Sequence, residues 1–130
     1  MQIVYTKEAP EPIGPYSQAM QVGSLLFCSG QIPIDPKTGN VEMGSIERQT
    51  ELVLNNVRAV LAKSGADLNQ VVKTTVFLSD MAHFQAMNQV YSRYFETFGK
   101  GNKPARSTIA VKELPKSVSV EIEVIAELQT

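Results

Sequence analysis

The sequence predicts a two-layer α/β or α+β sandwich, in which a sheet of roughly five or six strands carries two helices on one face. Two segments repeat apolar residues at spacings of three and four, which is typical of amphipathic helices. Several shorter segments are rich in β-branched residues or alternate apolar with polar residues, which favours strands. Because 130 residues have room for one hydrophobic core, residues 1–130 are expected to form a single domain.

The first part of the chain predicts a stiff loop followed by a hairpin. Residues 10–16 contain three prolines and a glycine, a composition that favours a fixed, extended loop. The runs 17–22 and 24–29, separated by Gly23, are expected to pair as a β-hairpin. Residues 35–40 have the composition of a turn.

A serine cap and a glycine mark the first predicted helix. Ser45 is a suitable N-cap for a helix that runs to about Ser64, and Gly65 is placed to end it. The apolar stripe of this helix consists of Ile46, Thr50, Val53, Leu54, Val57, Val60 and Leu61. The β-branched run at 71–79 then predicts a strand.

The second half predicts another helix and two more strands. Asp80 is expected to cap the helix and Gly99 to end it. Its apolar face consists of Phe84, Met87, Tyr91, Tyr94, Phe95 and Phe98. Residues 106–112 and 118–128 are expected to be strands joined by the loop 113–116.

Strands that are apolar on both faces predict an oligomer. The last strand alternates, with an apolar face of Val118, Val120, Ile122, Val124 and Ala126. By contrast, residues 25–28 and much of 71–78 are apolar on both sides. Two helices can cover only one face of the sheet, so a second subunit is expected to cover the other.

Composition excludes several classes of function. The formal net charge is −1 and the 12 basic residues are scattered, which argues against binding to nucleic acid or to an anionic membrane. With one cysteine, Cys28, and one histidine, His83, neither an internal disulfide nor a Cys/His metal cluster is expected. Cys28 is expected to be buried and inert. Residues 1–7 lack the pattern of a signal peptide and the apolar runs are too short to span a bilayer, so we expect a cytoplasmic protein.

Four polar residues are candidates for chemistry, each beside a plainer interpretation. Arg106 follows a proline-led loop at the start of a strand, where its guanidinium could bind a carboxylate bidentately. The alternative is a surface salt bridge with Glu121 or Glu123. The two glutamates point away from the helices and are either solvated or, at a buried interface, carboxylates with raised pKa that exchange protons. Asn88 lies near the edge of the second helix's apolar face and could be an ordinary surface amide.

Ordered motifs along essentially the whole chain resemble the Rid (reactive intermediate deaminase) family, and its deaminase-type subgroup most closely. The motifs are Ile-Gly-Pro-Tyr-Ser-Gln-Ala at 13–19, Ser-Gly-Gln-Ile-Pro at 29–33, Thr-Thr-Val-Phe-Leu-Ser-Asp-Met at 74–81, Met-Asn-Gln-Val-Tyr at 87–91, Lys-Pro-Ala-Arg-Ser-Thr at 103–108 and Val-Glu-Ile-Glu at 120–123. The resemblance implies a chorismate-mutase-like α+β fold with a mixed sheet of about six strands. It also implies a homotrimer with a cleft between each pair of adjacent subunits.

The same resemblance implies roles for individual residues. Arg106 would hold the substrate carboxylate, and Glu121 would orient or activate the attacking water. The residues implied to line the cleft are Tyr16, Ser29, Gly30, Asn88 and, through the backbone at Arg106–Thr108, Thr108. Many members have cysteine where this chain has Thr108, so a thiol role is lost here, although the backbone N–H at this position can still donate.

The activity implied is hydrolysis of 2-iminobutanoate or 2-iminopropanoate, with their enamine tautomers, to 2-keto acids and ammonia. Such substrates form when pyridoxal-phosphate dehydratases act on serine or threonine. Water already attacks these imines, so no metal or cofactor is expected; the enzyme has only to hold the carboxylate, place a water and move protons. The alternative is a regulatory trimer that binds small carboxylates without turnover, and an endoribonuclease fits the scattered basic residues less well.

Overall fold

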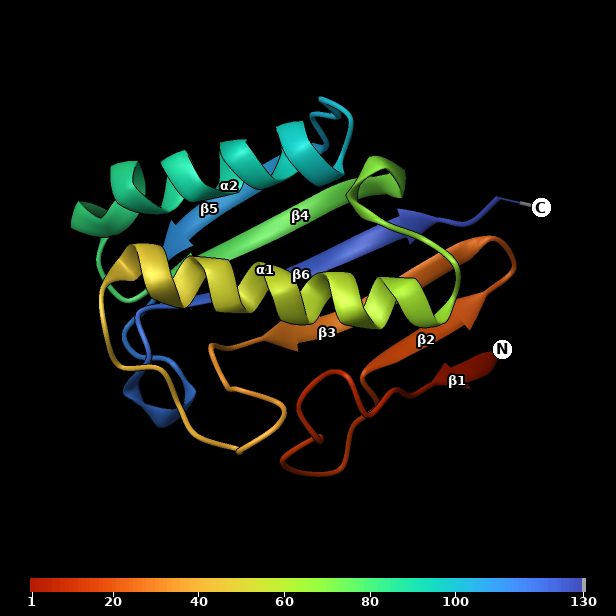
Figure 1. Cartoon of the computed structure of the whole chain (residues 1–130), viewed down its shortest axis with the longest axis horizontal. Helices are drawn as coiled ribbons and strands as arrows, with labels where there is room; N and C mark the ends of the chain where they lie inside the picture. The colour runs from red at the N-terminus through yellow and green to blue at the C-terminus, as the bar shows by residue number, and fades with distance from the viewer. Residues whose placement is uncertain (130) are drawn as a thin grey trace.

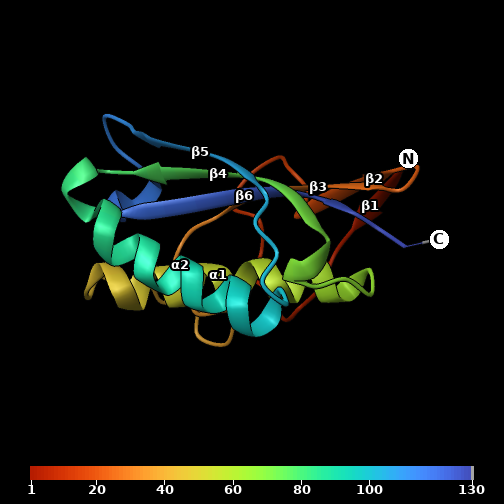
Figure 2. The ribbon, with the colours of Figure 1, turned by 90° about the horizontal axis from the view of Figure 1, so that it is seen from above.

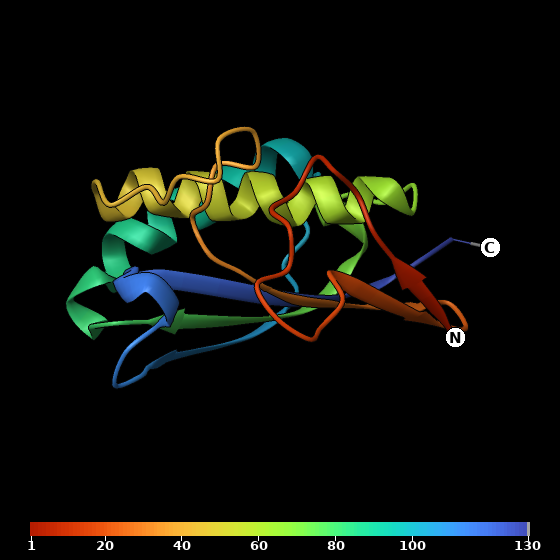
Figure 3. The same cartoon turned by 90° about the horizontal axis from the view of Figure 1, so that it is seen from below.

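The computed structural model, which describes residues 1–129, has two helices packed on one face of a single sheet (Figure 1). The strands are β1 (Gln2–Val4), β2 (Ala19–Val22), β3 (Leu25–Gln31), β4 (Val71–Leu78), β5 (Ala105–Ala110) and β6 (Val120–Glu127). The helices are α1 (Ile46–Lys63) and α2 (Phe84–Phe98), with three 3-10 turns, η1 (Leu68–Gln70), η2 (Met81–His83) and η3 (Pro115–Ser117). Seen edge-on in Figures 2 and 3, both helices lie on the same side of the sheet. The predicted α+β class and the one-sided helix layer are therefore confirmed.

The sheet is mixed, with the strand order β1-β2-β3-β6-β4-β5. Within residues 1–129, β4 and β5 are the one parallel pair, and they are joined through α2; the other neighbouring pairs are antiparallel. A crossover between parallel strands is almost always right-handed, so with α2 on this face of the sheet the next strand is placed on one particular side of β4. Strand β5 is thus an edge strand, and β4 separates it from β6.

Local signals account for α1, whereas two details elsewhere in the chain, at Asp80 and at β1, differ from the prediction. The Ser45 hydroxyl accepts a hydrogen bond from the Arg48 N–H at 3.2 Å, and Gly65 follows the helix with φ +75°. Asp80 caps η2 rather than α2, since its carboxylate accepts from the Ala82 N–H at 2.9 Å and the chain must turn before the helix starts. Strand β1 was not predicted because three residues are too few to show a period.

The core lies between the helices and one face of the sheet. In β6 the alternate residues Val120, Ile122, Val124 and Ala126 are buried beneath the helices, as their spacing predicts. Cys28 is also buried, and burial raises the pKa of its thiol to about 12, which fits an inert residue. On the opposite, open face Phe27 is 43% exposed and Ile109 47% exposed. Neither helix in residues 1–129 has the length and apolarity needed to cross a bilayer.

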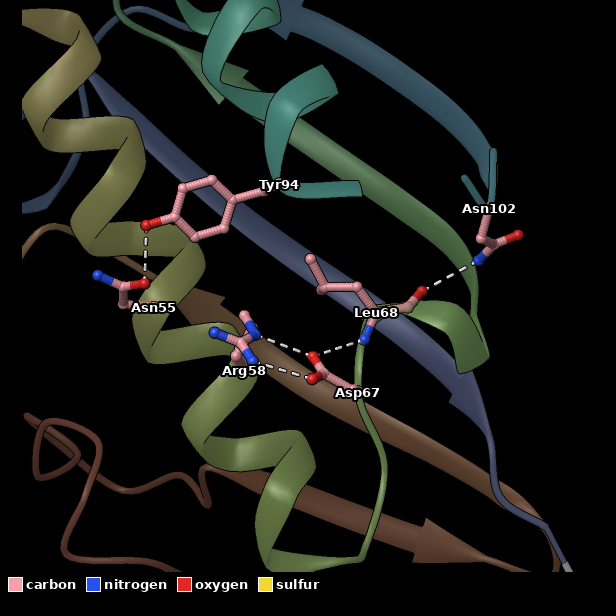
Figure 4. A network of polar contacts seen from close by, with 6 residues as sticks. All are labelled: Asn55, Arg58, Asp67, Leu68, Tyr94 and Asn102. Atoms are coloured by element: carbon pink, nitrogen blue, oxygen red, sulfur yellow. Dashed lines mark hydrogen bonds and ion pairs between the residues drawn. The ribbon is translucent and has the colours of Figure 1, made fainter. Parts of the chain in front are cut away.

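A cluster of polar contacts joins the two helices to the connection between α1 and β4 (Figure 4). The Arg58 guanidinium donates to both carboxylate oxygens of Asp67, at 2.9 and 3.0 Å, and lies 3.5 Å from the centre of the Phe98 ring. The Tyr94 hydroxyl donates to Oδ1 of Asn55 at 2.8 Å. These contacts fix α2 against α1, and α2 carries part of the candidate site.

Candidate functional site

The residues singled out from the sequence fall into two groups on opposite faces of the sheet. The first group, which we call the arginine half-site, faces α2 and comprises Asn88, Arg106 and Thr108. The second group, the glutamate half-site, lies on the open face and comprises Tyr16, Ser29, Gly30 and Glu121. Each group is assembled by the fold, but a single chain does not bring the two together.

In the arginine half-site, α2 holds the guanidinium of Arg106. Its Nη1 donates to Oδ1 of Asn88 at 2.7 Å, so Asn88 is a partner of the arginine rather than an ordinary surface amide. The Arg106 Cζ lies 4.6 Å from the ring centre of Tyr91 and 5.6 Å from that of Phe84. Phe84, Asn88 and Tyr91 follow one another at spacings of four and three, which places them on one side of α2.

The backbone of β5 adds unpaired hydrogen-bonding groups beside this guanidinium. Val111 donates its N–H to the Leu78 carbonyl of β4 at 2.8 Å. Because successive residues of a strand point their N–H and C=O groups to opposite sides, those of Arg106 and Thr108 point away from β4. Among the residues that the structure describes, no atom forms a hydrogen bond with the buried hydroxyl of Thr108. This edge therefore presents a cation and several backbone groups to whatever lies against it.

Tyr91 is part of this half-site, although the sequence placed it in the apolar face of the second helix and in the motif at 87–91 without giving it a role. Its hydroxyl shares a buried hydrogen bond of 2.8 Å with Oγ1 of Thr74. Burial raises the pKa of the Tyr91 phenol, an effect that outweighs the opposing influence of Thr74 and Arg106, so the ring stays neutral around pH 7. Its spacing from Asn88 and its place in the motif at 87–91 are the sequence signals, and neither shows that β5 lies alongside.

The glutamate half-site is built around a bulge in β3. Cys28 pairs with Val124 and Gln31 with Ile122, so β3 has one residue more than β6 between these pairs. Gly30 lies in this bulge, and the Glu121 carboxylate is packed against its backbone. A Cβ added to Gly30 would overlap Oε2 of Glu121 and lie 2.9 Å from its Cδ. Glycine at this position thus makes room for the carboxylate.

The Glu121 carboxyl is half-buried, and its pKa is raised. Desolvation is the larger cause, and the negative charge of Glu123 on the same face adds to it. A carboxyl whose pKa lies above its ordinary value holds and releases a proton closer to neutral pH. Of the two interpretations of this glutamate, the desolvated carboxylate agrees with the structure.

A cavity of about 670 Å³ opens in front of Glu121. Ser29 and Tyr16 line it, and both are held by backbone groups: the Ser29 hydroxyl donates to the Ser17 carbonyl at 2.6 Å, while the Tyr16 hydroxyl accepts from the Ile13 N–H at 3.1 Å. Lys116 also lines the cavity and was not predicted, since nothing in its local sequence shows that η3 folds toward this face.

Within one chain Arg106 and Glu121 are kept apart. Arg106 pairs in register with Thr74 of β4, and Glu121 pairs with Phe77 of the same strand from its other side. Among residues 1–129 Arg106 makes no ion pair, so the interpretation of a salt bridge with a glutamate on a neighbouring strand is wrong. The physical reason is the crossover through α2, which inserts β4 between the two strands. In the same part of the chain no three His, Cys, Asp or Glu side chains converge to hold a metal ion.

Comparison with known proteins identifies the family. Residues 6–128 match the sequence model of a family described as Endoribonuclease L-PSP. The solved structure of YyfA from Yersinia pestis, described as a member of the conserved Rid protein family, shares 45% identity with this chain, covers 98% of each chain and superposes with a TM-score of 0.93. This chain belongs to the Rid family.

Other relatives align over almost their full length. A RutC family protein of Pyrococcus abyssi is 50% identical over 125 residues, which are 96% of this chain and 95% of the relative. The structure of E. coli TdcF with bound serine is 39% identical, covers 99% of this chain and 100% of its own, and superposes with a TM-score of 0.94. The resemblance carried by the sequence motifs is therefore confirmed for the family and for the fold.

Proposed function

We propose that this Rid protein is a homotrimeric deaminase that hydrolyses 2-imino acids such as 2-iminobutanoate and 2-iminopropanoate to 2-keto acids and ammonia. The observation that carries the proposal is the separation of Arg106 and Glu121 into two half-sites. One supplies a rigid cation with backbone donors, and the other supplies a half-buried carboxyl with a raised pKa beside a cavity. Neither half is sufficient for the reaction, and the two are complementary.

A ring of subunits brings such halves together. When two different patches of one chain must meet, the contact is heterologous, and it closes only as a ring. Apolar side chains exposed on the open face, including Phe27 and Ile109, supply surface for the contact. The ring proposed is the trimer, with Arg106 of one subunit facing Glu121 of the next across each of three clefts.

The proposed chemistry needs only groups that the two half-sites carry. Arg106 binds the substrate carboxylate and so places C2 in front of Glu121. The oxygen of a water forms a bond to C2 as the π bond of C=N breaks and its electron pair moves to nitrogen. Glu121 accepts one proton of that water and delivers it to this nitrogen, which gives a neutral carbinolamine. Glu121 then moves the hydroxyl proton to the nitrogen; the oxygen electrons form C=O, the C–N bond breaks and ammonia leaves.

The cation of the arginine half-site supports the proposed substrate class. A guanidinium at an exposed strand edge suits an α-carboxylate, and serine, the molecule bound in E. coli TdcF, carries that group. Within residues 1–129 the hydrogen bond to Asn88 occupies one nitrogen of Arg106, Nη1, which leaves the rest of the guanidinium for a ligand. The proposal extends this recognition to imino and enamino acids.

The test is a coupled assay in which a dehydratase generates 2-aminoacrylate and ammonia release is followed with and without this protein. Glu121→Gln should lower turnover by on the order of a hundredfold, the usual scale for a positioned proton-transfer group. Calorimetric titration with 2-ketobutyrate should show binding unchanged or tighter, because the carboxylate is still held by Arg106. Equal rates for the wild type and Glu121→Gln would remove this residue from the mechanism.

A second candidate is a trimer that binds small carboxylates and catalyses nothing. The completeness of the arginine half-site favours it, since Arg106 with Asn88 and the β5 backbone can bind a carboxylate without help from Glu121. The same two measurements separate the candidates. A binding protein would titrate with 2-ketobutyrate and leave the decay of 2-aminoacrylate at its uncatalysed rate.

A further inference from the structure

Three contacts around Arg106 form a closed path through three elements. Arg106 on β5 pairs in register with Thr74 on β4, Thr74 shares a hydrogen bond of 2.8 Å with the Tyr91 hydroxyl on α2, and the Tyr91 ring lies 4.6 Å from the Arg106 guanidinium carbon. Thr74 is fully buried and Tyr91 is only 8% exposed. The link is therefore shielded from water, and it ends at the one residue of the proposed site that would bind the substrate carboxylate.

This path restricts the guanidinium in a way that packing alone would not. A cation near an aromatic face is attracted to it, so the ring provides a surface on which the planar fork can rest. The hydrogen bond between the Tyr91 hydroxyl and Thr74 fixes the far end of the ring and so stops it from tilting. Asn88 accepts from Nη1 at 2.7 Å and sets the rotation of the fork on that surface. Together the contacts leave one orientation of Arg106 favoured before any ligand arrives.

We propose that Tyr91 is a positioning residue, which orients Arg106 for bidentate binding of the substrate carboxylate through its ring and its link to Thr74. This inference deepens the proposed function and rests on it. Arg106 holds the carboxylate equally in the bound substrate and during the reaction. Loss of its orientation should therefore weaken binding and raise KM while kcat changes little.

The chain offers a matched control three residues further along α2. Tyr94 is also 8% exposed, and its hydroxyl also makes a 2.8 Å hydrogen bond, to Asn55 on α1 (Figure 4). Arg93 lies 5.9 Å from its ring centre, whereas among the described residues the aromatic rings beneath Arg106 are those of Phe84 and Tyr91. A tyrosine whose role is only to stabilise the fold should respond to loss of its hydroxyl as Tyr94 does.

The experiment compares Tyr91→Phe, Tyr91→Leu and Tyr94→Phe with the wild-type assembly, by steady-state ammonia release and by titration with 2-ketobutyrate. We expect Tyr91→Phe to raise KM and the 2-ketobutyrate Kd about threefold, and Tyr91→Leu, which also removes the aromatic face, about tenfold or more. In both variants kcat should stay within about twofold of wild type, because the lost interaction stabilises the bound substrate and the transition state equally. Tyr94→Phe should change neither constant.

A third measurement separates failure of this inference from failure of the proposed function. Rotation about the Nε–Cζ bond of Arg106, measured by NMR with labelled arginine, should be faster in Tyr91→Phe and Tyr91→Leu than in wild type and unchanged in Tyr94→Phe. A wild-type protein without deaminase activity would refute the proposed function, and the rotation rates would still judge the role of Tyr91. Equal rotation in all four proteins, or a fall in kcat at constant KM in the Tyr91 variants, would overturn the inference. If Tyr91→Leu fails to fold, Tyr91→Phe still provides the test.

Discussion

Replacement of Gly30 by alanine should disable the site while leaving the fold intact. The added methyl group would occupy the space that the Glu121 carboxylate fills, overlapping Oε2 and lying 2.9 Å from Cδ and 3.0 Å from Cγ. These atoms belong to the end of a flexible side chain, so the carboxylate can move aside without displacing the backbone. We expect the free energy of unfolding to change by less than about 1 kcal/mol, since Gly30 also lacks a positive φ that alanine would strain.

The size of the effect on activity follows from the displacement. To restore an ordinary contact with the new methyl group, the Glu121 carboxylate must shift by more than about 1 Å, and a misplacement of about 1 Å can already cost on the order of a hundredfold in rate. Coupled ammonia release would measure kcat/KM, and thermal unfolding at fixed protein concentration would measure stability. Gly44→Ala is the matched control, because a Cβ there would lie 2.5 Å from Oε2 of Glu42, a flexible carboxylate remote from both half-sites.

A double mutant shows whether Gly30 acts through Glu121. If the alanine only displaces that carboxylate, then Gly30→Ala combined with Glu121→Gln should be little worse than Glu121→Gln alone. Additive losses would mean that Gly30 contacts the substrate directly. A Gly30→Ala protein with kcat/KM within about threefold of wild type would refute the assignment of Glu121 to its observed position.

Three further predictions follow from the geometry. Arg106→Lys should lose at least about tenfold in kcat/KM with 2-imino acids, because an ammonium cannot pair bidentately, and near-full activity would contradict the carboxylate clamp. If Glu121 acts as the base, kcat/KM should rise with pH through a midpoint above the ordinary glutamate pKa, because burial and the charge of Glu123 raise the pKa of Glu121. Glu123→Gln removes the adjacent negative charge and should move that midpoint to lower pH. The midpoint should still lie above the ordinary value, because burial is the larger cause. Partial burial alone would raise the pKa of Asp67, but hydrogen bonds from Arg58 and the Leu68 N–H hold this pKa below its ordinary value. The contribution of Asp67 to the free energy of unfolding is therefore present above the unfolded pKa and is lost as the pH falls through the folded pKa. Asp67→Asn should therefore lower the free energy of unfolding by about 1–2 kcal/mol at pH 7 and by less at pH 3, whereas Glu51→Gln, which breaks the more exposed pair with Arg93, should change it by about 0.5 kcal/mol or less.

Features that depend on neighbouring residues could be predicted from the sequence. The serine cap of α1, its apolar stripe and the alternation of β6 are set by spacings of two to four residues, and the structure confirms all three. The one-sided helix layer follows from them, because two helices cannot cover both faces of a sheet. The motifs around Arg106 and Glu121 also indicate the family, because they are contiguous in the chain and can be read residue by residue.

The arrangement of the candidate site depended on contacts between residues that are distant in the chain. Only the strand order shows that β4 separates Arg106 from Glu121, and this is why the expected salt bridge does not form. The contacts of Arg106 with Asn88 and Tyr91 arise because the crossover through α2 lays that helix over β5, which no local spacing specifies. The sequence by itself determined the two helices, the longer strands, their buried faces and the chemical groups available. The tertiary structure decided which groups meet, because partners brought together by strand pairing and helix packing leave no mark in local periodicity.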